Sequence, residues 1–179
     1  MRSTRVYECS RGGVLLRTFS SIKSLPIFDV NSGKELGKVL DLCFDNKGTV
    51  NGLIMDTKGL LKKNKLIPLS QISSFGLDGI MLANEPEEER MTQKLMGLHF
   101  LETGQDRIIG KPLVTTEGNK LGLVEDVYFK EELGTIIGYE VTDGFFADMS
   151  EGRKIFKSSN PLTIGENVVI VDLHENENK

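Results

Sequence analysis

The chain of 179 residues has no tryptophan, only two cysteines and two histidines, and five prolines against nineteen glycines. A structural zinc site usually takes four Cys or His ligands close in space. The four candidate ligands stand singly along this chain, without the spacing of a ligand motif: Cys9, Cys43, His99 and His174. We therefore expect no metal and no other cofactor. Two isolated thiols are also typical of a reduced, cytoplasmic protein.

Long hydrophobic runs are also missing. The longest cover four residues, as at Val168–Val171, whereas a membrane-spanning helix needs about 20 apolar residues. Arg17 interrupts the apolar patch Val14–Leu16 before the core of a signal peptide develops. The sequence thus predicts a cytoplasmic protein without a membrane segment. Since Val and Leu codons also serve as bacterial starts, a start of translation near Val14–Leu16 is a further hypothesis.

The composition is that of a globular protein, with 39% hydrophobic and 27% charged residues. Aromatic residues make up only 7%, so the core must be aliphatic. The excess of glycine over proline favours many turns and hence many strands. A net charge of −4 argues against non-specific nucleic-acid binding as the main role.

The chain repeats itself once. Six of twelve residues are identical between Gly33–Phe44 and Gly118–Phe129, at an offset of 85. Two further pairs of similar stretches follow in the same order: Gly48–Gly52 with Gly134–Gly138, and Phe75–Leu82 with Ile164–Val171. Such ordered similarity indicates a duplicated unit. The predicted organisation is a disordered N-terminal tail (1–18), a first repeat (19–84), a linker with a short helix (85–107), a second repeat (108–173) and a polar tail (174–179).

Each repeat shows the signals of short strands joined by tight turns. Leu42 and Phe44 alternate toward one face and precede an Asp-Asn-Lys-Gly turn at Asp45–Gly48. Six short strands in about 65 residues bury their apolar faces best when the sheet closes into a barrel, which also removes most exposed edges. We therefore predict a mainly β protein made of two small six-stranded barrels.

The linker has a different composition. Pro86 and the acidic residues after it favour the start of a helix, and we expect a short helix over about 87–96. Met91, Leu95 and Leu98 follow at i, i+4 and i+7, the spacing of one helical face. This apolar stripe either packs on a barrel, which we favour, or recruits a partner helix.

The pattern Leu25-Pro26-Ile27-Phe28, followed by Gly33–Asp41 and Ile67–Ile80, resembles the PRC-barrel family. The second repeat resembles it less closely, with Ile155-Phe156-Lys157 in place of Ile67-Pro68-Leu69. The resemblance implies a six-stranded barrel like that of the photosynthetic reaction-centre H subunit and of the C-terminal domain of the ribosome maturation factor RimM. The membrane helix of the first and the N-terminal domain of the second have no counterpart here. A binding module is what the resemblance implies.

Asp41 and Asp126 occupy equivalent positions in the two repeats. One interpretation makes them, with Glu125, an acid–base or ligand site between the barrels. The interpretation that we favour is structural: an Asp after a Gly-containing bend accepts backbone N–H bonds of the turn.

Two matching loops are the candidate partner-binding sites. Each joins an apolar pair to a basic cluster, and the residues are Leu60, Leu61, Lys62, Lys63 and Lys65 in the first repeat and Phe145, Phe146, Arg153 and Lys154 in the second, with Lys157 beyond. The apolar pairs either plug the barrel ends or stay exposed for contact. The basic residues either bind an anionic partner or keep an edge strand from pairing.

These observations lead to a non-catalytic binding or adaptor module of a bacterial cytoplasm. Its expected partner is another protein, with no catalytic residues assigned. Alternatives are a ribosome- or RNA-associated factor, a small-ligand carrier or an enzyme, and a homodimer is compatible with the sequence.

Overall fold

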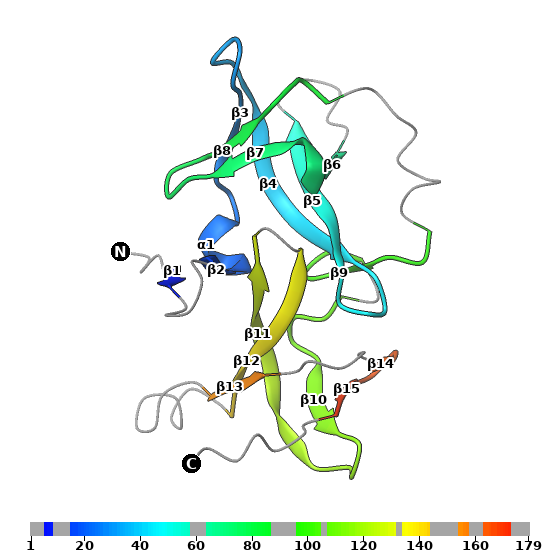
Figure 1. Ribbon diagram of the computed structural model, residues 1–179. Helices are drawn as coiled ribbons and strands as arrows, with labels where there is room; N and C mark the ends of the chain where they lie inside the picture. The colour runs from blue at the N-terminus through cyan, green and yellow to red at the C-terminus, as the bar shows by residue number, and fades with distance from the viewer. Residues whose placement is uncertain are drawn as a thin grey trace.

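The computed structural model describes residues 6–8, 15–57, 64–86, 96–104, 107–131, 134–143, 154–157 and 163–172. Two β-sheets dominate it, one of seven strands and one of eight (Figure 1). Each sheet is built around six strands from one sequence repeat. The prediction of a mainly β protein with two six-stranded units is therefore confirmed.

The first barrel has the strand order β6-β5-β4-β3-β8-β7. Its neighbouring strands are antiparallel except for β3 and β8, which are parallel. The elements are β3 (Pro26–Asp29), β4 (Glu35–Phe44), β5 (Val50–Thr57), β6 (Lys65–Pro68), the short 3-10 helix η1 (Leu69–Gln71), β7 (Ile72–Phe75) and β8 (Ile80–Leu82).

The second barrel repeats this order as β13-β12-β11-β10-β15-β14, again with one parallel pair, β10 and β15. Its strands are β10 (Pro112–Thr115), β11 (Lys120–Lys130), β12 (Thr135–Thr142), β13 (Lys154–Lys157), β14 (Thr163–Ile164) and β15 (Val169–Val171). The identical topology confirms that the sequence repeat is a repeat of structure.

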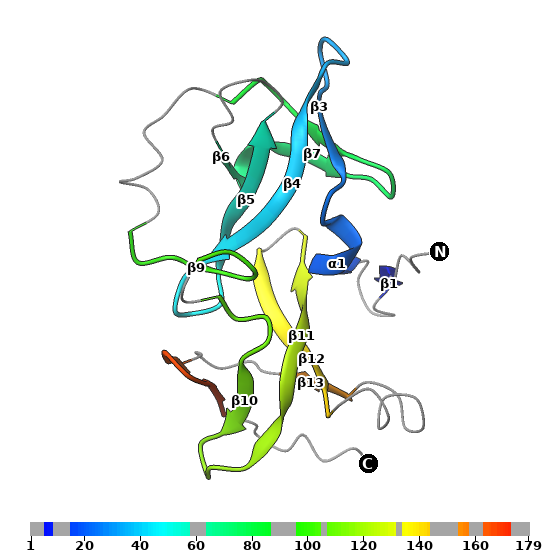
Figure 2. The ribbon, with the colours of Figure 1, turned by 180° about the vertical axis from the view of Figure 1, so that it is seen from behind.

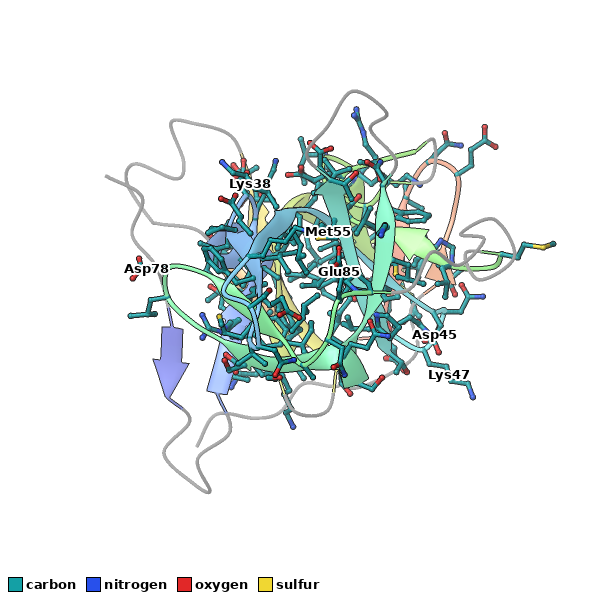
Figure 3. All side chains as sticks on the ribbon, turned by 90° about the horizontal axis from the view of Figure 1, so that it is seen from above. Lys38, Asp45, Lys47, Met55, Asp78 and Glu85 are labelled. Atoms are coloured by element: carbon teal, nitrogen blue, oxygen red, sulfur yellow. The ribbon has the colours of Figure 1, made fainter. Side chains whose placement is uncertain are left out.

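The hairpin between β4 and β5 forms for the reasons the sequence suggests. Asp45 accepts hydrogen bonds through Oδ1 from the backbone nitrogens of Lys47 at 2.8 Å and Thr49 at 2.9 Å. Gly48 adopts φ +75°, a conformation that glycine reaches without steric cost. Behind the turn, alternate residues point inward. Viewed from above, Met55 lies at the centre of the packed side chains, whereas Lys47 and Asp78 lie at the periphery (Figure 3).

Each six-stranded unit is extended by strands from outside its repeat. The two-residue strand β9 (His99–Phe100), which precedes the second barrel in the chain, pairs with β4 of the first barrel. Conversely, β2 (Leu15–Thr18), which precedes the first barrel, pairs with β11 of the second and carries β1 (Val6–Glu8) on its other side. We call residues 15–22 and 99–103 the lead-in segments of the first and second barrels. Each lead-in segment thus pairs with the opposite barrel. In Figure 2, α1 of the first lead-in segment lies beside β11 of the second barrel.

The prediction of a disordered N-terminal tail over residues 1–18 is wrong for the residues that form β1 and β2. Short segments show no periodicity of their own, and here the pairing comes from β11, more than 100 residues away in the chain. A four-residue helix, α1 (Phe19–Ile22), follows β2 and buries Phe19 and Ile22.

The two barrels also meet through their longest hairpins. Thr49 forms an isolated antiparallel bridge with Thr135, and Ile136 donates its N–H to the carbonyl of Gly48 at 2.8 Å. Phe75 and Phe129, one from each barrel, make an edge-to-face contact with ring centroids 6.3 Å apart. Buried residues of both repeats form one connected hydrophobic cluster. The core therefore runs through both barrels and is not two separate cores.

Residues 87–95, most of the helix predicted for the linker, and the polar tail 174–179 lie outside the described residues. Among the described linker residues that follow, Leu101 is fully buried, whereas Met96, Gly97, Thr103, Gly104 and Arg107 are exposed. Within the described residues, no helix has the length and hydropathy to cross a membrane.

Candidate functional site

The two equivalent aspartates lie at β-bulges in the longest strands. The register of β4 against β5 shifts between Val39 and Asp41, and that of β11 against β12 shifts between Val124 and Asp126. A bulge bends its strand and redirects a side chain. Both aspartates are buried, with 0% exposure at Asp41 and 4% at Asp126.

Asp41 holds the lead-in segment of the second barrel. Its Oδ2 accepts hydrogen bonds from the backbone nitrogen of Thr103 at 2.8 Å and from the Thr103 hydroxyl at 2.6 Å. Its Oδ1 accepts from the nitrogens of Leu42 at 2.8 Å and Leu101 at 3.2 Å, and Glu102 N–H lies 3.2 Å from both oxygens. The carboxylate thus joins β4 to the chain that enters the other barrel.

Asp126 of the second barrel holds the lead-in segment of the first barrel, with fewer hydrogen bonds. It accepts from the nitrogen of Val127 at 2.8 Å and from the nitrogen of Ser20 in α1 at 3.2 Å. Burial raises the pKa of the Asp126 carboxyl, the bonds from Ser20 and Val127 oppose that change, and the nearby charge of Glu140 adds to it. The folded protein therefore holds the charge of Asp126 at an energetic cost.

Both aspartates accept backbone N–H bonds, as the structural interpretation expected, but the donors are not only those of the aspartate's own turn. Beside the N–H of the next residue, each binds the lead-in segment of the opposite barrel and not only its own bend. Their acceptor positions are thereby occupied by N–H and hydroxyl donors, and Glu125, the third member of the proposed acid–base site, lies exposed in the bulge. The described residues contain no group of three or more His, Cys, Asp or Glu side chains that could hold a metal ion.

The surroundings of the two aspartates are not equivalent. Beside Asp126, the Tyr128 hydroxyl donates to Glu140 Oε2 at 2.8 Å, and both side chains are buried. The register places Cys43 and Ile54, both apolar in character, at the corresponding positions of the first barrel. Burial and the charge of Asp41 raise the pKa of the Cys43 thiol to about 12. This thiol is therefore a buried apolar group and not a nucleophile.

Arg17 in β2 is a contact between the barrels that sequence reasoning missed. Its side chain is 3% exposed and forms an ion pair with Glu131 of the second barrel. The guanidinium also donates to the carbonyls of Phe75 and Gly76 of the first barrel and lies 5.9 Å from the centre of the Phe75 ring. The one sequence signal was weak: Leu16-Arg17-Thr18 shares its Leu-x-Thr pattern with Leu101-Glu102-Thr103.

Most of the predicted partner-binding residues lie outside the described part of the chain: Leu60, Leu61, Lys62, Lys63, Phe145, Phe146 and Arg153. Lys65 and Lys154 are described, and they are equivalent. Lys65 in β6 pairs in register with Met55 of β5, and Lys154 in β13 pairs with Val141 of β12. The Lys65 ammonium donates to the Pro86 carbonyl at 3.4 Å, and that of Lys154 forms an ion pair with Asp143 at 2.8 Å.

The structure does not bring these two lysines together. β5 starts at the contact between the barrels and runs away from it for eight residues, about 26 Å of strand. β12 also has eight residues and runs in the opposite direction (Figure 1). Lys65 and Lys154 consequently lie toward opposite ends of the molecule. Any binding at these loops would use two separate surfaces.

Comparison with known proteins identifies the repeated unit. The PRC-barrel domain matches residues 16–89 and again residues 102–177. The chain is also 30% identical over 148 residues to the uncharacterized protein YrrD of Bacillus subtilis (strain 168), covering 82% of each chain.

Proposed function

The chain belongs to the PRC-barrel family, in a tandem form, and from that premise we propose that it is a non-catalytic adaptor that binds another protein. We place this adaptor in a bacterial cytoplasm, where the buried thiol of Cys43 would stay reduced. No membrane, metal or cofactor enters the proposal.

One observation carries the proposal: the carboxylates best suited to acid–base chemistry are committed to the architecture. A general acid or base must reach the proton it transfers. The oxygens of Asp41 instead accept bonds from Leu42 and the lead-in segment of the second barrel, and Asp126 accepts from α1. Interactions of this kind support a rigid scaffold and leave binding to the outer surfaces and loops.

The continuous core supports the same conclusion. Two barrels that share one hydrophobic cluster and exchange their lead-in segments hold their distal ends at a fixed separation. An adaptor that presents two surfaces benefits from such rigidity, because less conformational freedom is lost on binding.

Affinity capture from the native cytosol, with and without RNase, tests the proposal. The baits are the wild-type chain, the double variant L60S/L61S and its counterpart F145S/F146S, with L77S as the matched control. Leu77 is 59% exposed in the turn between β7 and β8 and belongs to neither apolar pair. We expect the same protein partner to survive RNase and to be lost from one of the double variants while L77S retains it.

Thermal unfolding of the same variants separates contact from packing. A loop variant that loses the partner but keeps its melting temperature supports a direct contact. A large fall in melting temperature would mean that the apolar pairs are plugs of the barrel ends. Ribosomal material that disappears with RNase and with rising salt would instead favour the alternative of a ribosome- or RNA-associated factor. Capture of nothing above background would contradict both.

A further inference from the structure

Strand β6 of the first barrel and its counterpart β13 in the second barrel differ in how far their side chains are exposed. The register aligns β6 with β13 residue by residue: Lys65 with Lys154, Leu66 with Ile155, Ile67 with Phe156 and Pro68 with Lys157. The alignment expected from sequence, with Ile155-Phe156-Lys157 against Ile67-Pro68-Leu69, is therefore one residue out of register.

In the first barrel this strand is largely covered. Ile67 is fully buried, its three neighbours in β6 are half-buried, and β6 leads directly through η1 into β7. In the second barrel the strand is open. Ile155 is 48% exposed, Lys154 and Lys157 are exposed, and Phe156 is half-buried against the core.

A proline is present at the end of β6 and absent from β13. Pro68 lacks an N–H and so blocks pairing at the end of β6, a common protection of edge strands. Lys157 occupies this position in β13 and keeps its N–H. Among the described residues, β13 pairs with β12 alone and β6 with β5 alone, so that no described strand covers the second edge of either, and only the edge of β6 carries a proline.

The side chains of β13 restrict what can bind beside it. Ile155 and Lys157 are two residues apart and therefore point to the same face of the sheet. A second copy of β13 in the same register would bring lysines near one another, which is unfavourable. An extended strand with an apolar residue opposite Ile155 and a carboxylate opposite Lys157 would fit both the apolar surface and the charge.

We propose that β13 is a docking edge for an extended segment of a partner protein, in which an acidic and an apolar residue alternate at i and i+2. This proposal rests on the protein-binding function above and names the chemistry of the partner. The segment adds a strand to the second barrel: main-chain bonds supply affinity, and Ile155 and Lys157 supply selectivity.

Two synthetic peptides test the docking edge on the intact ¹⁵N-labelled protein. Both are acetylated and amidated; one reads Thr-Thr-Glu-Thr-Val-Thr-Thr and the other has Lys in place of Glu. The order suits an antiparallel strand. Amide chemical shifts are followed up to about 2 mM peptide at low salt. We expect shifts centred on β13 and its neighbour β12, and tighter binding of the Glu peptide.

Three variants connect the shifts to the proposed contacts. K157E should reverse the preference, so that the Lys peptide binds about five-fold more tightly than the Glu peptide, in line with cross-strand charge pairs. I155T keeps a strand-forming residue and should weaken both peptides several-fold. L77T, at an exposed leucine in the β7–β8 turn, should leave both affinities unchanged.

The proposal is overturned if the β13 amides do not shift by 2 mM, if the shifts centre elsewhere, or if K157E fails to change the preference between peptides. Self-association that depends on Ile155 would point to a second copy as the occupant and would also overturn it. None of these results would affect capture of a protein through the loops, so failure of the docking edge and failure of the adaptor function are distinguishable.

Discussion

Removal of the Asp41 carboxylate should weaken the attachment of one barrel to the lead-in segment of the other. In D41A, the N–H groups of Leu42, Leu101 and Thr103 lose an acceptor in a region where Asp41 itself has no exposure to solvent. Each buried donor left without a partner costs about 1–3 kcal/mol. Leu101 keeps a second acceptor, the carbonyl of Leu42 at 3.3 Å, and Thr103 is exposed enough for water to replace part of its loss.

We therefore expect D41A to lower the free energy of unfolding by about 3–5 kcal/mol, because several of the donors that it leaves without a partner are buried. For a chain of this size, that corresponds to a fall in melting temperature of roughly 6–20 °C. D41N keeps one acceptor oxygen but turns an amide N–H toward the donors of Thr103. Its free energy of unfolding should therefore fall by less than that of D41A, but measurably.

The matched control is the equivalent change at Asp126. This carboxylate accepts from two backbone nitrogens and from the Ser20 side chain, and it lies beside the charge of Glu140. In D126A, the loss of these hydrogen bonds destabilises the fold, whereas the relief of the repulsion between Asp126 and Glu140 stabilises it. We therefore expect the free energy of unfolding to fall by only about 1 kcal/mol. Urea unfolding followed by circular dichroism gives both values. Equal losses at the two sites, or a loss below about 1 kcal/mol for D41A, would refute this account of Asp41.

Three further outcomes follow from the contact between the barrels and the buried carboxylates. Calorimetry should show one cooperative unfolding transition, with equal calorimetric and van't Hoff enthalpies, because the hydrophobic cluster spans both barrels; two separated transitions would contradict a shared core. G134A should destabilise the fold more than G118A. Both glycines have positive φ, but a Cβ at Gly134 would lie 3.0 Å from the backbone oxygen of Val50 and would also meet Leu69 Cδ1, whereas a Cβ at Gly118 would have nothing beyond its chain neighbours within 4 Å. Equal losses of stability would show that only the backbone conformation matters. The pKa of the Asp126 carboxyl is raised above its ordinary value of 3.8, so the folded protein binds the carboxyl proton more tightly than the unfolded chain does. The wild type should therefore lose stability relative to D126N as the pH rises from the unfolded pKa through the folded pKa of this group. A gain of stability relative to D126N over the same pH range would contradict the raised pKa.

Local signals were sufficient for the barrel strands. The alternation at Leu42 and Phe44 and the turn at Asp45–Gly48 depend on neighbouring residues only, and the structure has both where the sequence predicts them. The repeat itself was readable because glycines and the bulge aspartate recur at a constant offset. Family membership followed from the same residues.

The arrangement of the two repeats could not be predicted in this way. Leu15–Thr18 and His99–Phe100 carry no periodicity, and each becomes a strand because an unpaired edge of the opposite barrel accepts it. Arg17 illustrates the point: an isolated arginine after the short apolar run Val14–Leu16 predicts no particular partner, yet the fold surrounds it with Glu131, Phe75 and Gly76.

The sequence alone thus determined the class of fold, the duplication and the position of each aspartate within its repeat, because hydrophobic alternation, turn chemistry and glycine spacing act over a few residues. Only the tertiary structure decided that Asp41 and Asp126 hold the opposite barrel's lead-in segment, and that the side chains of β13 are more exposed than those of β6. The contacts of the two aspartates with these segments join residues 60 or more positions apart in the chain. Pairing over such distances is selected by the burial and hydrogen bonding of the whole molecule.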